Sequence, residues 1–162
     1  MSEKSPQEEE LTRLGRLALI PFGVGAAVMW LSPWLAPQSI AMEIHHIVLP
    51  YAAVIAAFLA GSAAGAELIP KLGPPQSFLP PILAALAAWL VVWQGHPFLY
   101  IGPAWRYLII IALFIYLLLR DLAAVRAELL PRWYGELRKY LTFWATMALL
   151  LMMSRLLLWG HS

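Results

Sequence analysis

Residues 44–65 read IHHIVLPYAAVIAAFLAGSAAG, an unbroken stretch without a single Asp, Glu, Lys or Arg. A helix needs about 20 mostly apolar residues to cross the roughly 30 Å hydrocarbon core of a bilayer. The apolar positions are continuous and do not alternate with polar ones, so the stretch predicts a transmembrane helix and not a strand of a transmembrane barrel. We therefore expect an all-α, polytopic integral membrane protein.

Four other apolar runs flank this one. The predicted transmembrane helices are roughly Leu17–Leu35, Ile44–Gly65, Phe78–Gln94, Trp105–Leu119 and Tyr140–Trp159. The third and fourth are short for full crossings. The chain begins MSEKSPQEEE, which is acidic and has no apolar face, so we expect residues 1–12 to be a disordered tail. Residues 13–162 are expected to form one five-helix domain.

The overall composition supports the membrane assignment and excludes other classes. Of the 162 residues, 62% are hydrophobic and 12% are charged, with a mean hydropathy of +0.73. Soluble domains are usually near 45–50% apolar and about 25% charged, so a soluble enzyme, a disordered chain and a nucleic-acid binder all fit badly. The chain has no cysteine, which excludes disulfides, thiolate metal sites and iron–sulfur ligation.

The positions of the basic residues predict the orientation. With the N-terminus inside, all 11 Lys and Arg residues except Arg106 and Arg155 lie on the inner side. The positive-inside rule favours this arrangement and places the C-terminus outside. The longest polar connector, Arg120–Lys139, has an apolar and a polar helical face. We expect it to form an amphipathic interfacial segment before the last helix, where it binds anionic headgroups or a partner.

The second predicted helix carries a row of small residues. Ala53, Ala57, Gly61 and Gly65 are spaced by four and lie on one helical face, and the last two form a GxxxG pair. Small side chains let two membrane helices approach closely. We favour packing inside the bundle over homodimerisation as the use of this face.

Candidate polar residues gather on the predicted outer side. They are Glu43, His45, His46, His96 and Arg106. Imidazoles and a carboxylate together can bind a divalent metal, but no HExxH-type spacing is present and adjacent histidines point in different directions on a helix. Solvent-facing histidines are the favoured interpretation. No catalytic nucleophile motif or paired carboxylates occur, so we predict no enzyme, no cofactor and no metal site.

Three segments resemble a known membrane family. They are residues 14–22 (LGRLALIPF), residues 51–61 (YAAVIAAFLAG), and Asp121 followed by residues 130–142 (LPRWYGELRKYLT). Together they resemble the family called domain of unknown function 3429, which is transmembrane protein 69-like, over about residues 14–158. The resemblance implies a small polytopic protein of the bacterial or mitochondrial inner membrane without an established activity. It also implies a shared interfacial or partner anchor at Arg132, Trp133, Tyr134, Arg138 and Thr142.

One departure from the family pattern concerns the second helix. The family tends to follow its glycine pair there with His-Trp-Gly, whereas this chain has Ser62-Ala63-Ala64-Gly65. A family role that depends on that histidine is therefore not expected here. With small residues in place of histidine and tryptophan, this part of the helix is expected to serve helix packing alone.

The functional expectation is a non-enzymatic accessory or assembly subunit of a larger bioenergetic complex in the bacterial inner membrane. Its expected partners are the lipid bilayer and either another membrane protein or further copies of itself, with no nucleic acid. One alternative is a small-molecule carrier or a lipid- or quinone-binding protein with the outer polar residues at its mouth. A second alternative is a metal- or haem-dependent membrane enzyme, which would need the outer histidines to converge.

Overall fold

The computed structural model describes residues 5–32, 34, 37–67, 77–93 and 101–159 and, within those ranges, contains helices and no strand. The helices are α1 (Pro6–Leu17), α2 (Ile20–Leu31), α3 (Gln38–Glu67), α4 (Leu79–Val92), α5 (Pro103–Arg126) and α6 (Arg132–Trp159). The all-α class predicted from the sequence is confirmed.

Among the described residues, four helical segments are long and apolar enough to cross a membrane. They are Pro6–Leu31, which combines α1 and α2, then Glu43–Gly65 within α3, Pro103–Arg126 and Arg132–Leu158. Helix α4 is apolar but has only 14 residues. At 1.5 Å per residue that is roughly 21 Å, short of a core of about 30 Å. The fold is therefore compatible with a membrane, and α4 is shorter than the four segments that are long enough to cross it.

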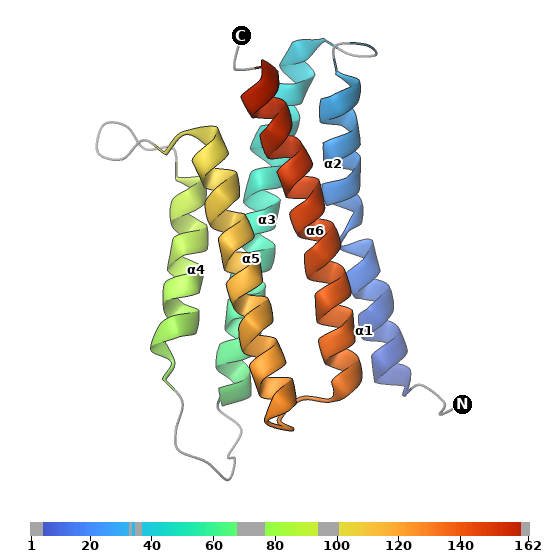
Figure 1. Cartoon of the computed structure of the whole chain (residues 1–162), viewed down its shortest axis with the longest axis vertical. Coiled ribbons are helices and arrows are strands. Elements are labelled where there is room, and N and C mark those ends of the chain that lie inside the picture. The colour runs from blue at the N-terminus through green and yellow to red at the C-terminus, as the bar shows by residue number, and fades with distance from the viewer. Residues whose placement is uncertain (1–4, 33, 35–36, 68–76, 94–100, 160–162) are drawn as a thin grey trace.

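Successive passes of the chain run in opposite directions (Figure 1). Helix α3 packs on α2, α4 and α5, while α6 packs on α5, α2 and α1. We call the end of the bundle that holds the start of α1 and the α5–α6 turn the lower end, as drawn in Figure 1. The upper end holds the start of α3 and the last turns of α6.

Helix α1 begins earlier than the sequence suggested. Instead of a tail over residues 1–12, the structure places Pro6–Leu17 in a helix. The Ser5 hydroxyl accepts a hydrogen bond from the Glu8 backbone N–H at 3.2 Å. Proline at the first helical position and acidic residues in the first turn favour a helix start in the same place. The helix start is thus favoured by capping and helix-dipole effects, and the later part of α1 packs on α6.

Helices α1 and α2 are separated by a break at Ala18 and Leu19. Pro21 lies in the first turn of α2 and has no backbone N–H, so the preceding turn loses a helical hydrogen bond. The Tyr51 hydroxyl of α3 donates to the Ala18 carbonyl oxygen at 3.0 Å and satisfies an acceptor at the break. Pro50, in contrast, lies inside the continuous helix α3.

The connector between the last two helices differs from the prediction. Residues 120–139 do not form a separate interfacial helix, because α5 continues to Arg126 and α6 runs without a break from Arg132 to Trp159. The N–H of Glu128 bonds to the Val125 carbonyl and the N–H of Leu129 to the Ala124 carbonyl, which is a Schellman ending. Glu128 adopts the left-handed conformation that this ending requires, with φ 58°.

The core lies where α2, α3, α5 and α6 meet. Its largest fully buried side chains include Met29, Tyr107, Ile110, Phe114 and Leu149. Many large apolar side chains point outward, and Val54, Phe58, Trp105 and Leu158 are each about two-thirds exposed. A soluble monomer rarely exposes so much apolar surface, whereas a bilayer covers it. The outward faces are therefore the lipid-facing faces of a small bundle.

Candidate functional site

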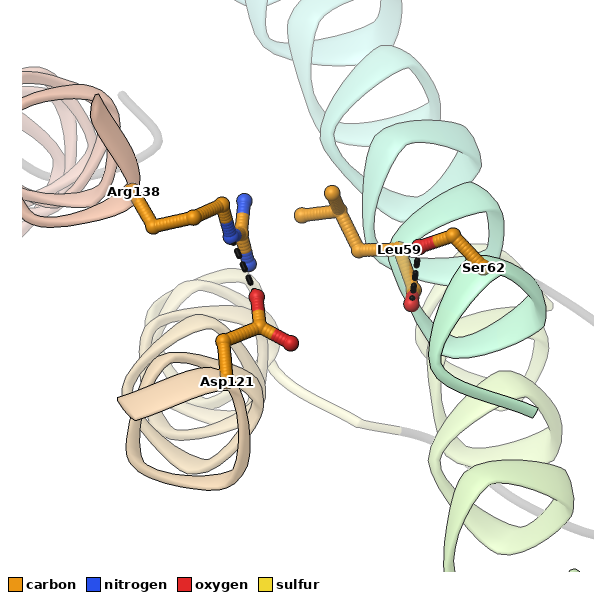
Figure 2. A network of polar contacts seen from close by, with 4 residues as sticks. All are labelled: Leu59, Ser62, Asp121 and Arg138. Atoms are coloured by element: carbon orange, nitrogen blue, oxygen red, sulfur yellow. Dashed lines mark hydrogen bonds and ion pairs between the residues drawn. The ribbon is translucent and has the colours of Figure 1, made fainter. Parts of the chain in front are cut away.

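A buried ion pair joins α5 to α6 near the lower end (Figure 2). Arg138 Nε donates to Asp121 Oδ2 at 2.5 Å, and the two side chains are 5% and 10% exposed. Figure 2 shows both groups on the side of their helices that faces Leu59 and Ser62 of α3. A buried charge costs several kcal/mol of desolvation unless a partner compensates it. Each group is therefore tolerated because the other is present.

The hairpin geometry explains why these two residues meet. Asp121 and Arg138 are 17 positions apart and lie equally far on either side of the turn around Glu128–Leu130. In an antiparallel helix pair, residues at equal distances from the turn lie opposite each other. The sequence did not reveal the pair, because the apolar run that predicts this helix ends at Leu119, before Asp121, whereas α5 continues to Arg126. Symmetry about the turn is the signal that finds it.

Two buried polar atoms adjoin the pair without a hydrogen bond to any described residue. They are Arg138 Nη2 and Thr142 Oγ1, one helical turn apart on α6. The Arg138 and Thr142 residues are each only 4% exposed. Buried donors of this kind usually bind protein oxygens or an ordered water. The site therefore holds a paired Asp121–Arg138 charge and, beside it, two polar atoms that can still donate a hydrogen bond.

The five residues of the predicted interfacial set differ in burial. Arg132 is exposed, Trp133 and Tyr134 are half-buried, and Arg138 and Thr142 are buried. The rings of Trp133 and Tyr134 meet edge to face with centroids 6.1 Å apart. Arg138 and Thr142 thus face the bundle interior and are not positioned to contact headgroups.

The predicted outer polar cluster comes together only in part. His45 is buried, and its Nδ1 lies 3.0 Å from the Tyr107 hydroxyl oxygen in a hydrogen bond. The His46 ring lies 5.1 Å from the His45 ring, and Glu43 is exposed. His96 lies outside the described residues. Within the described ranges, no group of three or more His, Cys, Asp or Glu side chains could hold a metal ion.

Two arginines at the upper end bind backbone oxygens. Arg106, from the predicted cluster, is buried and its Nε donates to the Ile101 carbonyl at 2.7 Å. Arg155 is also buried and its Nε donates to the Met29 carbonyl at 3.2 Å. Met29 is in the last turn of α2, where carbonyls have no helical partner and a cation is favourable. Arg155 thereby joins α6 to the end of α2, a role that the sequence did not reveal.

The small-residue row of α3 is also divided. Ala53 is buried and Ala57 is half-buried, but Gly61 and Gly65 are exposed. A Cβ added to either glycine would meet nothing within 4 Å. The GxxxG pair therefore does not pack against the described part of the bundle, which differs from the predicted use of this face for packing inside the bundle. The neighbouring row Ala52, Ala56 and Ala60 takes that place, with at most 1% exposure.

Among the described glycines, the one where an added Cβ would lie nearest to a neighbouring helix is one that the pattern did not single out. A Cβ added to Gly25 of α2 would lie 2.6 Å from Val48 Cγ2 of α3. A Cβ added to Gly23, two residues earlier, would meet nothing within 4 Å. At Gly25, therefore, the backbone of α2 lies too close to the Val48 side chain of α3 to accept a Cβ without a shift.

The apolar helices, the outward apolar faces and the internal charge pair define a helical membrane protein with an interior polar site. The chain belongs to the family described as "Protein of unknown function (DUF3429)", which matches residues 7–154. The family predicted from the three sequence segments is thus confirmed, while the likeness to transmembrane protein 69 stays a prediction. No curated protein matches the chain, and no solved structure matches it.

Proposed function

We propose that the protein is an accessory or assembly subunit that binds another membrane protein through the C-terminal half of α3. The observation that supports this most directly is the outward position of Gly61 and Gly65. Lipid provides no hydrophobic drive for helix association, so close backbone packing at small residues is the main attraction. An exposed GxxxG pair offers such packing to a helix from outside the bundle.

The shape of α3 around the glycines favours a helix as the occupant. The outward stripe of α3 is bulky at Ile47, Val54 and Phe58, whose side chains are 63%, 65% and 69% exposed. One turn later the stripe reaches Gly61 and then Gly65, which have no side chain. Ser62 beside them bonds to its own helix, donating to the Leu59 carbonyl at 2.8 Å (Figure 2). The outward stripe of α3 therefore changes from bulky side chains to backbone without side-chain cover, and we call this stretch at Gly61 and Gly65 the notch.

The membrane arrangement proposed with this role has five crossings, with the N-terminus inside and the bacterial inner membrane as the location. The alternating chain directions support an odd number of crossings, with α4 as the short one (Figure 1). The described basic residues also support the orientation. The lower end carries Arg13, Arg16, Arg120, Arg126, Arg132, Arg138 and Lys139, and the upper end carries Arg106 and Arg155.

The absence of cysteine from the sequence makes this topology directly testable. We expect Ser5→Cys and Ser162→Cys to be labelled from opposite sides of the membrane by an impermeant maleimide. Cytoplasmic labelling should occur at Ser5→Cys. Labelling of both from the same side would mean an even number of crossings and would contradict the proposed arrangement.

The subunit role is tested by extraction from native membranes in mild detergent. Native mass spectrometry of the purified chain should show a stoichiometric membrane-protein partner. Gly61→Leu and Gly65→Leu fill the notch and should abolish the association. Ala112→Leu, at an exposed alanine of α5, adds the same bulk elsewhere and should retain it. Isolation of a stable, partner-free monomer from native membranes would reject the role.

The other two functional hypotheses receive less support from the geometry. The carrier hypothesis needs the outer polar residues at a mouth, but His45 and Arg106 are buried in contacts with Tyr107 and Ile101. The metal or haem enzyme needs outer histidines that converge. Among the described residues, His45 and His46 adjoin without a third acidic or histidine ligand.

A further inference from the structure

A long apolar groove lies on the outer surface between α2 and α6. It has a volume of about 710 Å³. On the α2 side its lining includes the small residues Gly23, Ala26 and Ala27. The side chains of Trp30 and Trp144 also line it. The groove exists because α2 presents small residues to α6 where other positions carry bulky ones.

A second, polar hollow adjoins the lower end of this groove. Its volume is about 460 Å³, and Glu9, Thr12 and Arg13 contribute to it. The two hollows share Arg16 and Ile20, so they meet at the break between α1 and α2. The whole depression therefore has a polar compartment followed by an apolar one. This arrangement suits a molecule with a polar head and an apolar tail.

The polar compartment is positively charged. Arg13 and Arg16 are exposed, and neither forms an ion pair with a described residue. The Arg16 guanidinium lies 5.8 Å from the centre of the Tyr140 ring, a cation–π contact that holds it at the mouth of the groove. The described residues that line the compartment include two arginines and one carboxylate, Glu9, so the lining favours an anion.

The length of the apolar compartment matches one leaflet of a bilayer. It extends along α2 from Leu19 to Trp30. At 1.5 Å per residue this distance is roughly 16 Å, against roughly 15 Å for half of the hydrocarbon core. Arg13 and Arg16 then lie at headgroup depth, where basic side chains attract anionic lipids.

We propose that this depression is a binding site for one anionic phospholipid of the lower-end leaflet. The phosphate binds Arg13 and Arg16, and one acyl chain lies in the groove between α2 and α6. Charge complementarity favours this occupant over a quinone, because a quinone supplies no negative group for the two arginines. The site is separate from the Gly61–Gly65 notch on α3 and goes beyond the proposed subunit role.

The headgroup contact is tested with the full chain purified in detergent. Native mass spectrometry is performed with equimolar phosphatidylglycerol and phosphatidylethanolamine of identical acyl chains. One phosphatidylglycerol should be retained preferentially. The double variant Arg13→Gln/Arg16→Gln should lower that preference by roughly 25-fold, at about 5-fold for each arginine. The charge-matched control Arg126→Gln/Lys139→Gln, at two exposed basic residues of the same end, should keep it.

The acyl-chain contact is tested by filling the groove. Ala27→Leu places bulk at an exposed groove alanine and should release the lipid, whereas Ala112→Leu adds the same bulk to α5 and should not. Equal retention of both lipids by the unmodified chain would overturn the proposal. So would equal retention of ubiquinone, or a dimer that Ala27→Leu dissociates. Loss of the preference in both double variants would also overturn it, because the effect would then be unspecific surface charge.

Discussion

The residues that most constrain the interior are Asp121 and Arg138. Their ion pair crosses from α5 to α6 in a region where neither charge is tolerated alone. It allows α5 and α6 to continue as helices through segments that the sequence alone presents as a polar connector. The pair thus lies inside the observed helical hairpin, in the segment that was predicted to be interfacial.

Asp121→Asn should destabilise the protein by about 3–5 kcal/mol, because it leaves the Arg138 charge buried without a counterion. The measurement is tryptophan-fluorescence unfolding in detergent. The double variant Asp121→Asn/Arg138→Gln removes both charges and should recover most of the loss.

The exposed pair of Lys139 and Glu136 provides the control. Lys139 Nζ lies 2.8 Å from Glu136 Oε1, with side chains 51% and 75% exposed. Lys139→Gln should change the free energy of unfolding by less than about 1 kcal/mol. If Asp121→Asn is as mild as this control, the buried pair does not have the structural role assigned to it.

At the scale of elements, the tight approach of α2 to α3 at Gly25 replaces the contact expected at the α3 glycines. Gly25→Ala should destabilise the protein by about 1–3 kcal/mol, since its Cβ would lie 2.6 Å from Val48 Cγ2. Val48 is buried and β-branched, so its side chain has little freedom to move. Thermal unfolding compares it with Gly23→Ala, which should be neutral or stabilising because its Cβ meets nothing. If Gly25→Ala and Gly23→Ala change thermal stability equally, the tight contact at Gly25 is contradicted.

The ending of α5 offers a stabilising substitution. Glu128 has φ 58°, a conformation that glycine adopts without a steric cost. Glu128→Gly should raise the free energy of unfolding by roughly 0.5–1 kcal/mol, because it removes the steric cost of the left-handed conformation. Ala127→Gly, at a neighbour with φ −79°, should lower it by a similar amount. A Glu128→Gly variant that is less stable than the parent would contradict the assigned helix ending.

Helix existence could be predicted from the sequence, while helix ends and contacts could not. The apolar runs locate α2 to α6 because a spanning helix leaves a continuous hydropathy signal. The start of α1 could not be predicted from hydropathy, because its first residues are acidic and its signal there is a Ser5 cap and a Pro6 start. The direction of the GxxxG face was missed because spacing places Gly61 and Gly65 on one side of α3 without saying what lies opposite.

On the scale of the whole molecule, the chain combines a well-filled interior with outward faces that are apolar nearly all round. The interior contacts explain how the bundle holds together, and the bilayer explains the exposed apolar side chains. Neither accounts for an outward notch at Gly61 and Gly65, which leaves helix backbone without side-chain cover. A partner helix in that notch is the central claim about function.

Site-specific photocrosslinking from position 62 in native membranes tests that claim most directly, because Ser62 lies between the two glycines and is exposed. A photoreactive residue there should form a single dominant adduct with another membrane protein, and Gly65→Leu should remove that adduct. The same probe at Phe143, which is 55% exposed on α6, should give no such adduct. Adducts with lipid alone at position 62, or the same protein adducts from both positions, would contradict the account.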